Sequence, residues 1–209
     1  MWLNNVKVEK LDTWGRRSIA ISDIHANLPY FRGLLEKLKL TPEDVLVLCG
    51  DFLEKGTESL ATLRFIMELS EKYDVHPICG NCDSWAEVVY GETYFVPDRL
   101  RQYMLFRRSG LCWDMFSELG VEITEDIDLV PLMKTLEESF RAEWQFLNEL
   151  PEVVETPHYI IVHGGIKPDV PPEEQMAGDC MKFDNFLGTD YFFDKWVIVG
   201  HWPVMLYLP

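Results

Sequence analysis

Polar residues that can bind metals follow five short apolar runs of the chain. The clusters are Ser-Asp-Ile-His at 22–25, Gly-Asp at 50–51, Gly-Asn-Cys-Asp at 80–83, His-Gly-Gly at 163–165 and Gly-His at 200–201. Their carboxylate and amide oxygens and imidazole nitrogens form a mixed ligand set that suits Mn, Fe or Zn ions. One such cluster alone is more often a helix N-cap or a hydrogen-bonded core histidine. Five in order instead indicate a redox-free hydrolytic metal centre.

The apolar runs themselves predict the elements that position these clusters. Strands are predicted at 18–21, 45–49, 75–79, 159–162 and 197–199. Amphipathic helices are predicted over 29–38 and around Leu60, Leu63 and Met67. This alternation is typical of βαβ units, in which ligands bind beyond the carboxyl ends of the strands. The five clusters are therefore expected to converge although they are distant in sequence.

The stretch from about 90 to 156 interrupts the alternation with mostly helical patterns. Its apolar residues recur at spacings of three or four, at Met133, Leu136, Phe140, Trp144 and Leu147. We interpret this stretch as a helical, cap-like insertion. A chain of 209 residues is expected to form a single domain, residues 1–209, that contains this insertion.

The composition limits the partners and the compartment. With 35 acidic and 19 basic residues, the net charge of −16 predicts that the protein binds neither duplex nucleic acid nor anionic membranes. An anionic substrate must then be attracted locally, as bound metal ions would do. The chain lacks a signal peptide and an apolar stretch of membrane-spanning length, and its five cysteines do not suggest a disulfide framework. These features predict a cytoplasmic protein and do not indicate its oligomeric state.

The order of the clusters resembles the calcineurin-like metallophosphoesterase superfamily, whose motifs are D-x-H, G-D, G-N-H-[DE], a lone His and G-H. His-Gly-Gly at 163–165 and Gly-His-Trp-Pro-Val at 200–204 are most similar to the phosphoprotein phosphatase branch. The resemblance implies an α/β (α+β) fold, the αββα sandwich of two facing mixed sheets flanked by helices. It also implies two divalent transition-metal ions, Mn²⁺ in the first place and Fe or Zn as alternatives.

The same resemblance assigns six metal ligands. Asp23 and His25 are expected to bind the first ion, Asn81, His163 and His201 the second, and Asp51 both. A hydroxide that bridges the two ions is then the expected nucleophile, which attacks phosphorus in line. Asp51 and Asn81 thereby become catalytic candidates as well as ligands.

Three departures from the family pattern affect catalysis. Cys82 replaces the histidine that acts as general acid in phosphoprotein phosphatases, and Glu54 replaces the aspartate that orients this histidine. Loss of a positioned acid should favour substrates with good leaving groups. Lys55 replaces the phosphate-binding arginine and is the third catalytic candidate, although a point charge takes the place of a bidentate fork. Arg107 and Arg108 are expected on a solvated helix face, unless the insertion folds over the site.

The expected activity is hydrolysis of a phosphomonoester, with phosphoserine or phosphothreonine as candidates, as in a serine/threonine phosphatase-like enzyme. Hydrolysis of a dinucleoside polyphosphate or another phosphodiester is the alternative, and a non-catalytic interaction module on the same fold is a third reading. The Cys79-Gly-Asn-Cys82 sequence also matches a redox motif, which we regard as a coincidence. Since the family continues for several strands beyond its Gly-His motif, we expect that the chain is truncated at its C-terminus.

Overall fold

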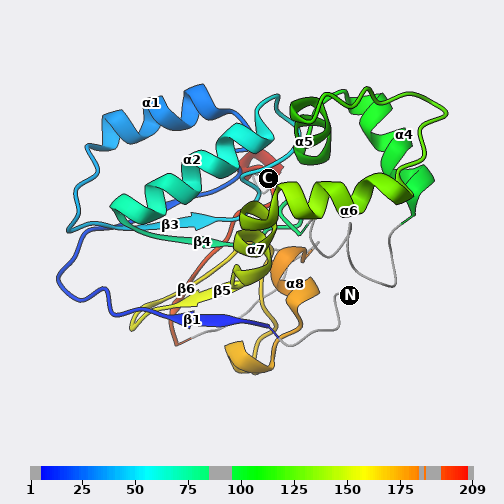
Figure 1. The fold of residues 1–209 in the computed structure, drawn as a ribbon. Coiled ribbons are helices and arrows are strands. Elements are labelled where there is room, and N and C mark those ends of the chain that lie inside the picture. The colour runs from blue at the N-terminus through cyan, green and yellow to red at the C-terminus, as the bar shows by residue number, and fades with distance from the viewer. Residues whose placement is uncertain (1–5, 85–95, 184–185, 187–193, 207–209) are drawn as a thin grey trace.

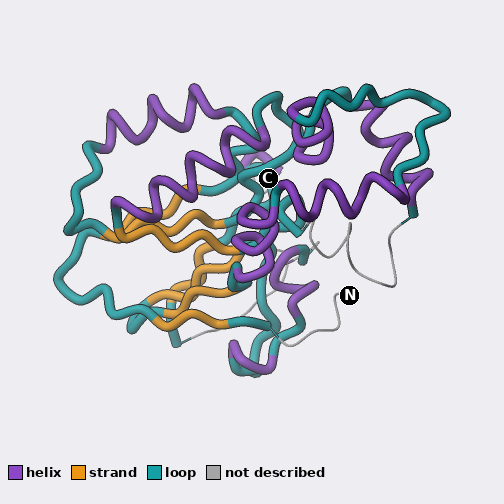
Figure 2. Tube along the Cα trace, in the orientation of Figure 1, coloured by secondary structure: helices purple, strands orange, loops and turns teal. Residues whose placement is uncertain are grey.

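Two β-sheets face each other in the computed structural model, with long helices along the outer face of one sheet and a short helix packed on the other (Figures 1 and 2). The structure describes residues 6–84, 96–183, 186 and 194–206. The expected αββα layering is therefore confirmed. Among the described residues, no helix has the length and apolar character needed to cross a membrane.

The first sheet is parallel and is formed by the N-terminal βαβ units. Its strand order is β2-β3-β4. The elements are β2 (Ser18–Ile21), α1 (Leu28–Leu38), β3 (Val45–Cys49), α2 (Ser59–Lys72) and β4 (Asp74–Ile78). Two of these strands have the predicted bounds, and β4 begins and ends one residue earlier. The polar clusters that follow the three strands consequently lie at one edge of the sheet.

Strand β3 is buried on both of its faces because it is the central strand. Alternate side chains of a strand point to opposite faces. Val45, Val47 and Cys49 belong to the apolar cluster between the two sheets, whereas Leu46 and Leu48 pack with residues of α1 and α2. A continuous apolar run of five residues is the expected signature of such a strand.

The second sheet is mixed and has the strand order β1-β5-β6-β7. Its elements are β1 (Val8–Lys10), β5 (Val153–Glu155), β6 (Tyr159–Val162) and β7 (Trp196–Ile198), and α8 (Ala177–Met181) covers its outer face. Only β5 and β6 pair antiparallel. In the interface between the sheets, β3 packs against β6 and β4 against β5. Two 3-10 turns, Pro172–Glu174 and Val204–Leu206, complete this part.

Within the described residues, the predicted insertion is formed by four helices. Its elements are α4 (Pro97–Arg107), α5 (Leu111–Glu118), α6 (Val130–Ser139) and α7 (Arg141–Glu149). The expected boundary near 156 is wrong, because β5 already belongs to the second sheet. Residues 85–95, where the insertion was expected to begin, lie outside the described residues.

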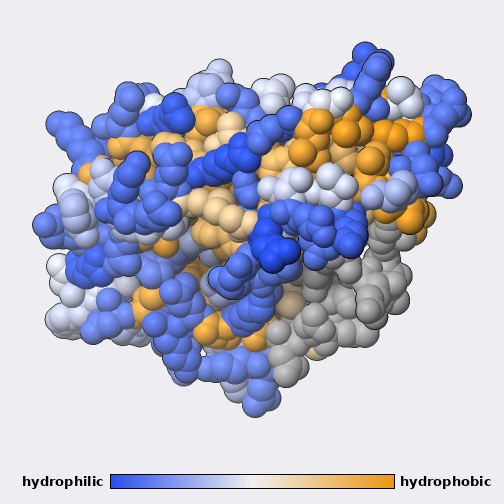
Figure 3. Space-filling model, viewed as in Figure 1, coloured by the Kyte–Doolittle hydropathy of each residue, from blue (hydrophilic) through white to orange (hydrophobic). Residues whose placement is uncertain are grey.

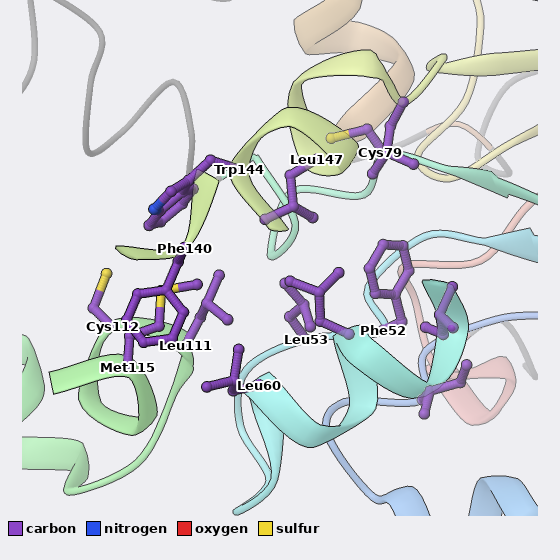
Figure 4. Packing of buried hydrophobic residues seen from close by; sticks show 14 of the residues in the cluster. Phe52, Leu53, Leu60, Cys79, Leu111, Cys112, Met115, Phe140, Trp144 and Leu147 are labelled. Atoms are coloured by element: carbon purple, nitrogen blue, oxygen red, sulfur yellow. The ribbon is translucent and has the colours of Figure 1, made fainter. Parts of the chain in front are cut away.

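The insertion packs on α2 and extends the main apolar core. The helical pattern predicted through Leu147 is divided at Phe140, which ends α6 and precedes α7. Phe140, Trp144 and Leu147 are nevertheless buried in one cluster with Leu53 (Figure 4). On the face shown in Figure 3, hydrophobic residues gather at the upper right, where Figure 1 shows the insertion helices, and smaller hydrophobic patches interrupt the hydrophilic surface elsewhere.

Candidate metal centre

The loops that follow the strands converge through backbone hydrogen bonds. The amides of Asp23 and His25 donate to the carbonyls of Gly50 and Asp51, at 3.1 and 2.9 Å. In the second sheet, the amide of Gly200 donates to the carbonyl of His163 at 2.9 Å. Clusters that lie up to 178 residues apart are joined, since the His201 amide also donates to Asp23 Oδ2 at 3.1 Å.

Four of the six predicted ligands have a left-handed backbone. The φ angles are 56° at Asp23, 47° at His25, 52° at Asp51 and 66° at His201. Residues other than glycine rarely adopt this backbone conformation, which costs about 1–3 kcal/mol of conformational energy. It persists where contacts with the surrounding structure enforce it. Such strain is typical of functional sites.

Asp51 lies at the centre of the group and is fully buried. Its Oδ1 is 3.2 Å from His163 Nε2, and its Oδ2 is 3.8 Å from His25 Nε2. The two carboxylate oxygens therefore face two different histidines, which come from opposite sheets. This geometry suits a ligand that is shared between two ions.

Three buried atoms of the predicted ligands have no hydrogen-bond partner. These are Asp51 Oδ2, Asn81 Oδ1 and His163 Nε2. The 3.2 Å approach of His163 Nε2 to Asp51 Oδ1 lacks the alignment of a hydrogen bond. Burial of a polar atom without a hydrogen bond raises the free energy of the folded state, so three such atoms in one site need an explanation. A bound cation would interact with all three and supplies one. The donor set thus fits the expected transition-metal ions.

The backbone fixes which nitrogen of two histidines faces the centre. His163 Nδ1 lies 2.9 Å from the carbonyl of Cys49, and His25 Nδ1 lies 3.3 Å from the carbonyl of Leu53. A carbonyl only accepts, so Nδ1 must donate in both rings, and in the neutral imidazole Nε2 then carries the lone pair. This is the arrangement in which histidines bind metals.

Two ligand groups emerge from the distances between side-chain atoms. Asp51, His163 and His201 form one, and His25, Asp51 and Cys82 form the other, with the ligand atoms of each group within 4.8 Å of one another. Asp23 stands beside the second group, because its Oδ1 is 3.5 Å from His25 Nε2.

The electrostatics favour the ligand forms of Asp51 and His201, whereas for His163 burial would lower the pKa but the adjacent Asp51 carboxylate raises it. Burial would raise the pKa of Asp51, but the adjacent His163 ring and the Cys82 amide hold it well below its usual value. Burial and the nearby His163 lower the pKa of His201, so its imidazole is neutral. Carboxylates bind metals when they are ionised and histidines when they are neutral.

Three supporting residues were not identified as functional from the sequence. Ser22 Oγ donates to Asp23 Oδ2 at 2.5 Å and thereby fixes that carboxylate. Asp83 is fully buried and accepts from the amides of Gly80, Asp51 and Leu53, at 2.9, 2.6 and 3.0 Å. Cys82 brings its thiol to the ligand group named above. All three lie inside the polar clusters, which is the signal that could have revealed them.

The two remaining departures from the family pattern are clear in the structure. Lys55 Nζ lies 2.9 Å from His25 Nε2 and 3.7 Å from Asp51 Oδ2, so its ammonium is at the ligand group. Glu54 points away, to Tyr103 in the insertion. It therefore does not serve as the orienting half of an acid dyad with Cys82.

Residues 16–205 match the sequence model of the family described as calcineurin-like phosphoesterase. The chain belongs to this family. Calcineurin-like phosphoesterases use a dinuclear divalent metal centre, in agreement with the two groups of candidate ligands. The resemblance recognised in the sequence is thus confirmed, while the assignment of individual ligands and the identity of the metal stay predictions.

Two curated relatives named symmetrical bis(5'-nucleosyl)-tetraphosphatase are similar to part of the chain. The protein from Cellvibrio japonicus is 39% identical over 72 residues, which are 34% of this chain and 26% of that protein. The protein from Pectobacterium atrosepticum is 35% identical over 71 residues, 34% of this chain and 25% of that protein. The matched segments span only about a quarter of the relatives.

A solved structure is similar over a larger part of this calcineurin-like phosphoesterase. It belongs to a protein proposed to be a diadenosine tetraphosphatase, and the similarity covers 81% of this chain and 60% of that one. The TM-score is 0.52 and the sequence identity is 21%. At this identity, the likeness shows the fold alone.

Proposed function

We propose that this calcineurin-like phosphoesterase hydrolyses a phosphoanhydride bond of a dinucleoside polyphosphate, with two divalent metal ions as cofactors. The observation that carries the proposal is the group of unpartnered buried atoms on Asp51, Asn81 and His163, because a scaffold without metal has no use for them. The names of the two partial relatives support the choice of substrate class.

The chain supplies ligands from both sheets. Asp23 and His25 would hold the first ion, and Asn81, His163 and His201 the second. Asp51 would contact both ions. When bound, two such ions lower the pKa of a water and stabilise the charge that develops on phosphoryl oxygens.

The other groups of the site orient and neutralise the substrate. Lys55 would attract a phosphate, because its ammonium already lies within 4 Å of atoms of two proposed ligands. The buried Asp51 and His163 are closed to solvent, so electrostatic interactions among them are stronger than in water. Ser22 and Asp83 keep the ligand loops in place without contacting the substrate.

The missing acid dyad favours an anhydride over an alkyl ester. Glu54 bonds to the insertion and Cys82 has no imidazole, so neither can protonate a leaving alkoxide as the family dyad does. A nucleotide leaving group carries its own negative charge on phosphate oxygens and needs no proton to depart. A phosphomonoester with an alkyl leaving group would need an acid that the site lacks. Hydrolysis of a phosphomonoester is therefore kept as the competing hypothesis.

Turnover of three substrate classes tests the proposal directly. The Mn²⁺-loaded protein is assayed with diadenosine tetraphosphate, p-nitrophenyl phosphate and a phosphoserine peptide, with Asp51→Asn as the inactive control. We expect cleavage of the first at the highest kcat/KM. Faster cleavage of the peptide would support the phosphomonoester hypothesis. A protein that binds Mn²⁺ and cleaves none of them would favour the non-catalytic module.

A further inference from the structure

Glu54 is a buried carboxylate that the site chemistry does not use. Only 3% of its surface is exposed. Oε1 accepts the Leu111 amide at 2.6 Å, and Oε2 accepts the Tyr103 hydroxyl at 2.8 Å. Gly110, which precedes α5, leaves room for this carboxylate, because a Cβ there would overlap Glu54 Oε2. Both donors belong to the insertion, so one side chain of the β3–α2 loop bonds to α4 and α5 together.

The loop that carries Glu54 is strained and lies against the ligand group. Glu54 and Lys55 both have left-handed φ angles, 61° and 65°. Gly56 follows, and a Cβ at this glycine would overlap the carbonyl of His25. Two successive left-handed residues persist only where other contacts enforce them. For this loop, the hydrogen bonds of Glu54 and the donation of Ser59 Oγ, at 3.1 Å from the Glu54 amide, are such contacts.

Lys55 connects this loop to the metal centre. Its long side chain has many rotamers, and its Nζ lies 2.9 Å from His25 Nε2 while residues 54 and 55 have left-handed φ angles. Ordering a lysine costs up to about 2 kcal/mol of side-chain entropy. Ordering its backbone costs about a further 1–2 kcal/mol, and a loop that the insertion already holds in place avoids that backbone cost when substrate binds.

The insertion does not depend on Glu54 for its own attachment. Arg64 of α2 bonds to Glu118 of α5 and Glu143 of α7 at 2.8–2.9 Å. The Leu60 amide donates to Asp114 Oδ2 at 3.1 Å, and Leu53, Leu60 and Leu111 share one buried cluster (Figure 4). Removal of the Tyr103 hydroxyl should therefore leave the insertion folded in place.

We propose that Glu54 is a positioning residue, through which Tyr103 and α5 of the insertion hold Lys55 in place to bind substrate phosphate. The inference rests on the proposed function of Lys55 at the metal centre. It explains why a glutamate stands where the family pattern has an aspartate, since the longer side chain reaches the insertion rather than residue 82. The helical insertion thereby becomes part of the phosphate-binding apparatus.

The first test is a double-mutant cycle between Tyr103→Phe and Lys55→Ala, measured with diadenosine tetraphosphate and Mn²⁺. Tyr103→Phe should raise KM about tenfold and change kcat less than about twofold, because it loses one hydrogen bond to a charged group. In the Lys55→Ala background, the same substitution should have no effect on KM. Unchanged KM in the single variant, or effects that multiply in the double variant, would overturn the proposal.

A matched control separates positioning from general attachment of the insertion. Glu118→Gln weakens the bond of α5 to Arg64 without touching Glu54, and it should leave KM unchanged. If Glu118→Gln raised KM as much as Tyr103→Phe, any loosening of the insertion would suffice and a specific role of Glu54 would be excluded.

Hydrogen exchange of the metal-free protein gives a second readout that does not need activity. Tyr103→Phe should accelerate exchange of the amides of residues 54–56, whereas Glu118→Gln should not. Equal exchange in Tyr103→Phe and the unmodified protein would overturn the positioning of Lys55. Absence of turnover in the unmodified, Mn²⁺-loaded protein would instead refute the proposed function, and the exchange result would still decide the role of Glu54.

Discussion

Two clusters of histidines and carboxylates join the two sheets, and they differ in how completely their polar atoms are paired. In the candidate metal centre, buried atoms of Asp51 and His163 have no hydrogen-bond partner. In the second cluster, both ring nitrogens of His76 of β4 lie within hydrogen-bond distance of carboxylates, Glu9 of β1 at 2.8 Å and Asp74 at 2.7 Å. Arg16 completes that cluster through a 2.5 Å contact with Asp74.

The two clusters also differ in backbone conformation. The ligand loops carry left-handed residues, whereas β4, which carries both His76 and Asp74, is a regular strand. Composition alone would not separate the two clusters, since both combine imidazoles with carboxylates. Unpaired atoms together with local strain indicate a site that awaits a ligand, and complete pairing indicates a structural ion cluster.

The largest expected effect is that of Asp51→Asn on metal binding and activity. Loss of the shared ligand should lower kcat/KM by about 10³-fold or more, because the ions contribute several kcal/mol to transition-state stabilisation. Mn²⁺ at 100 times its Kd should stabilise the unmodified protein by about 2.7 kcal/mol and the variant by almost nothing. Denaturant unfolding with and without Mn²⁺ measures the difference.

The comparison also predicts the metal-free behaviour of this variant. Asparagine keeps an oxygen for the Cys82 amide, and loss of the carboxylate charge removes two opposing contributions, the cost of its burial and its attraction to His163. Without metal, the free energy of unfolding should therefore change by less than about 1 kcal/mol. A loss of several kcal/mol in the absence of Mn²⁺ would show that the centre is a structural cluster like that of His76.

The next effect is the dependence of rate on the leaving group. With Glu54 engaged by the insertion, aryl and anhydride phosphates should be cleaved at least about 100-fold faster than alkyl phosphates. Cys82→His should narrow this gap by restoring a possible acid. Values of kcat/KM across a series of leaving-group pKa values measure the slope for both proteins. A flat series in the unmodified protein would mean that another group already supplies the proton.

A smaller effect concerns the pH dependence of stability. Burial alone would lower the pKa of His76, but its bonds to Glu9 and Asp74 raise it above the usual value. The protonated ring is favoured in the folded state, so its contribution is full below the unfolded pKa near about 6.5. It is lost as the pH rises through the raised folded pKa.

The pH dependence of the stabilisation by His76 predicts the stability of His76→Gln. The variant should lose about 1 kcal/mol of stability at pH 6 and progressively less toward pH 9, a modest value because both carboxylates are partly exposed. His158→Gln is the matched control, since that ring packs against Trp14 at 5.8 Å. A pH-independent loss in His76→Gln would mean that the ring contributes by packing alone.

The sequence predicted those parts of the fold that local patterns determine. The position of β3 could be predicted because five consecutive apolar residues between turns are too short for a helix and suit a strand buried on both faces. The ligand clusters were found because they follow such strands directly. By contrast, β1 and β5 were missed, since each has three residues and too few side chains to show a period of two.

Other features depend on contacts that are distant in sequence. The left-handed φ angles at Asp23 and Asp51 arise from the pairing of neighbouring loops, and these are not residue types that demand such a conformation. Glu54 bonds to residues 49 and 57 positions away. Its replacement of the family aspartate was visible in the sequence, but its partner in the insertion was not.

Substitution of Cys79 and Cys82 should have the smallest effect on activity. It tests whether Cys82 is a metal ligand. Cys79 is buried at the end of β4, whereas Cys82 Sγ lies in a group with His25 and Asp51. Because six other residues are proposed to hold the two ions, Cys79→Ala with Cys82→Ser should keep kcat/KM within about twofold, a change below about 0.5 kcal/mol. Activity and bound Mn²⁺ are measured on the same preparation. Loss of metal would make Cys82 a ligand and enlarge the centre, whereas loss of activity with metal intact would point to a role for the thiol in the reaction itself.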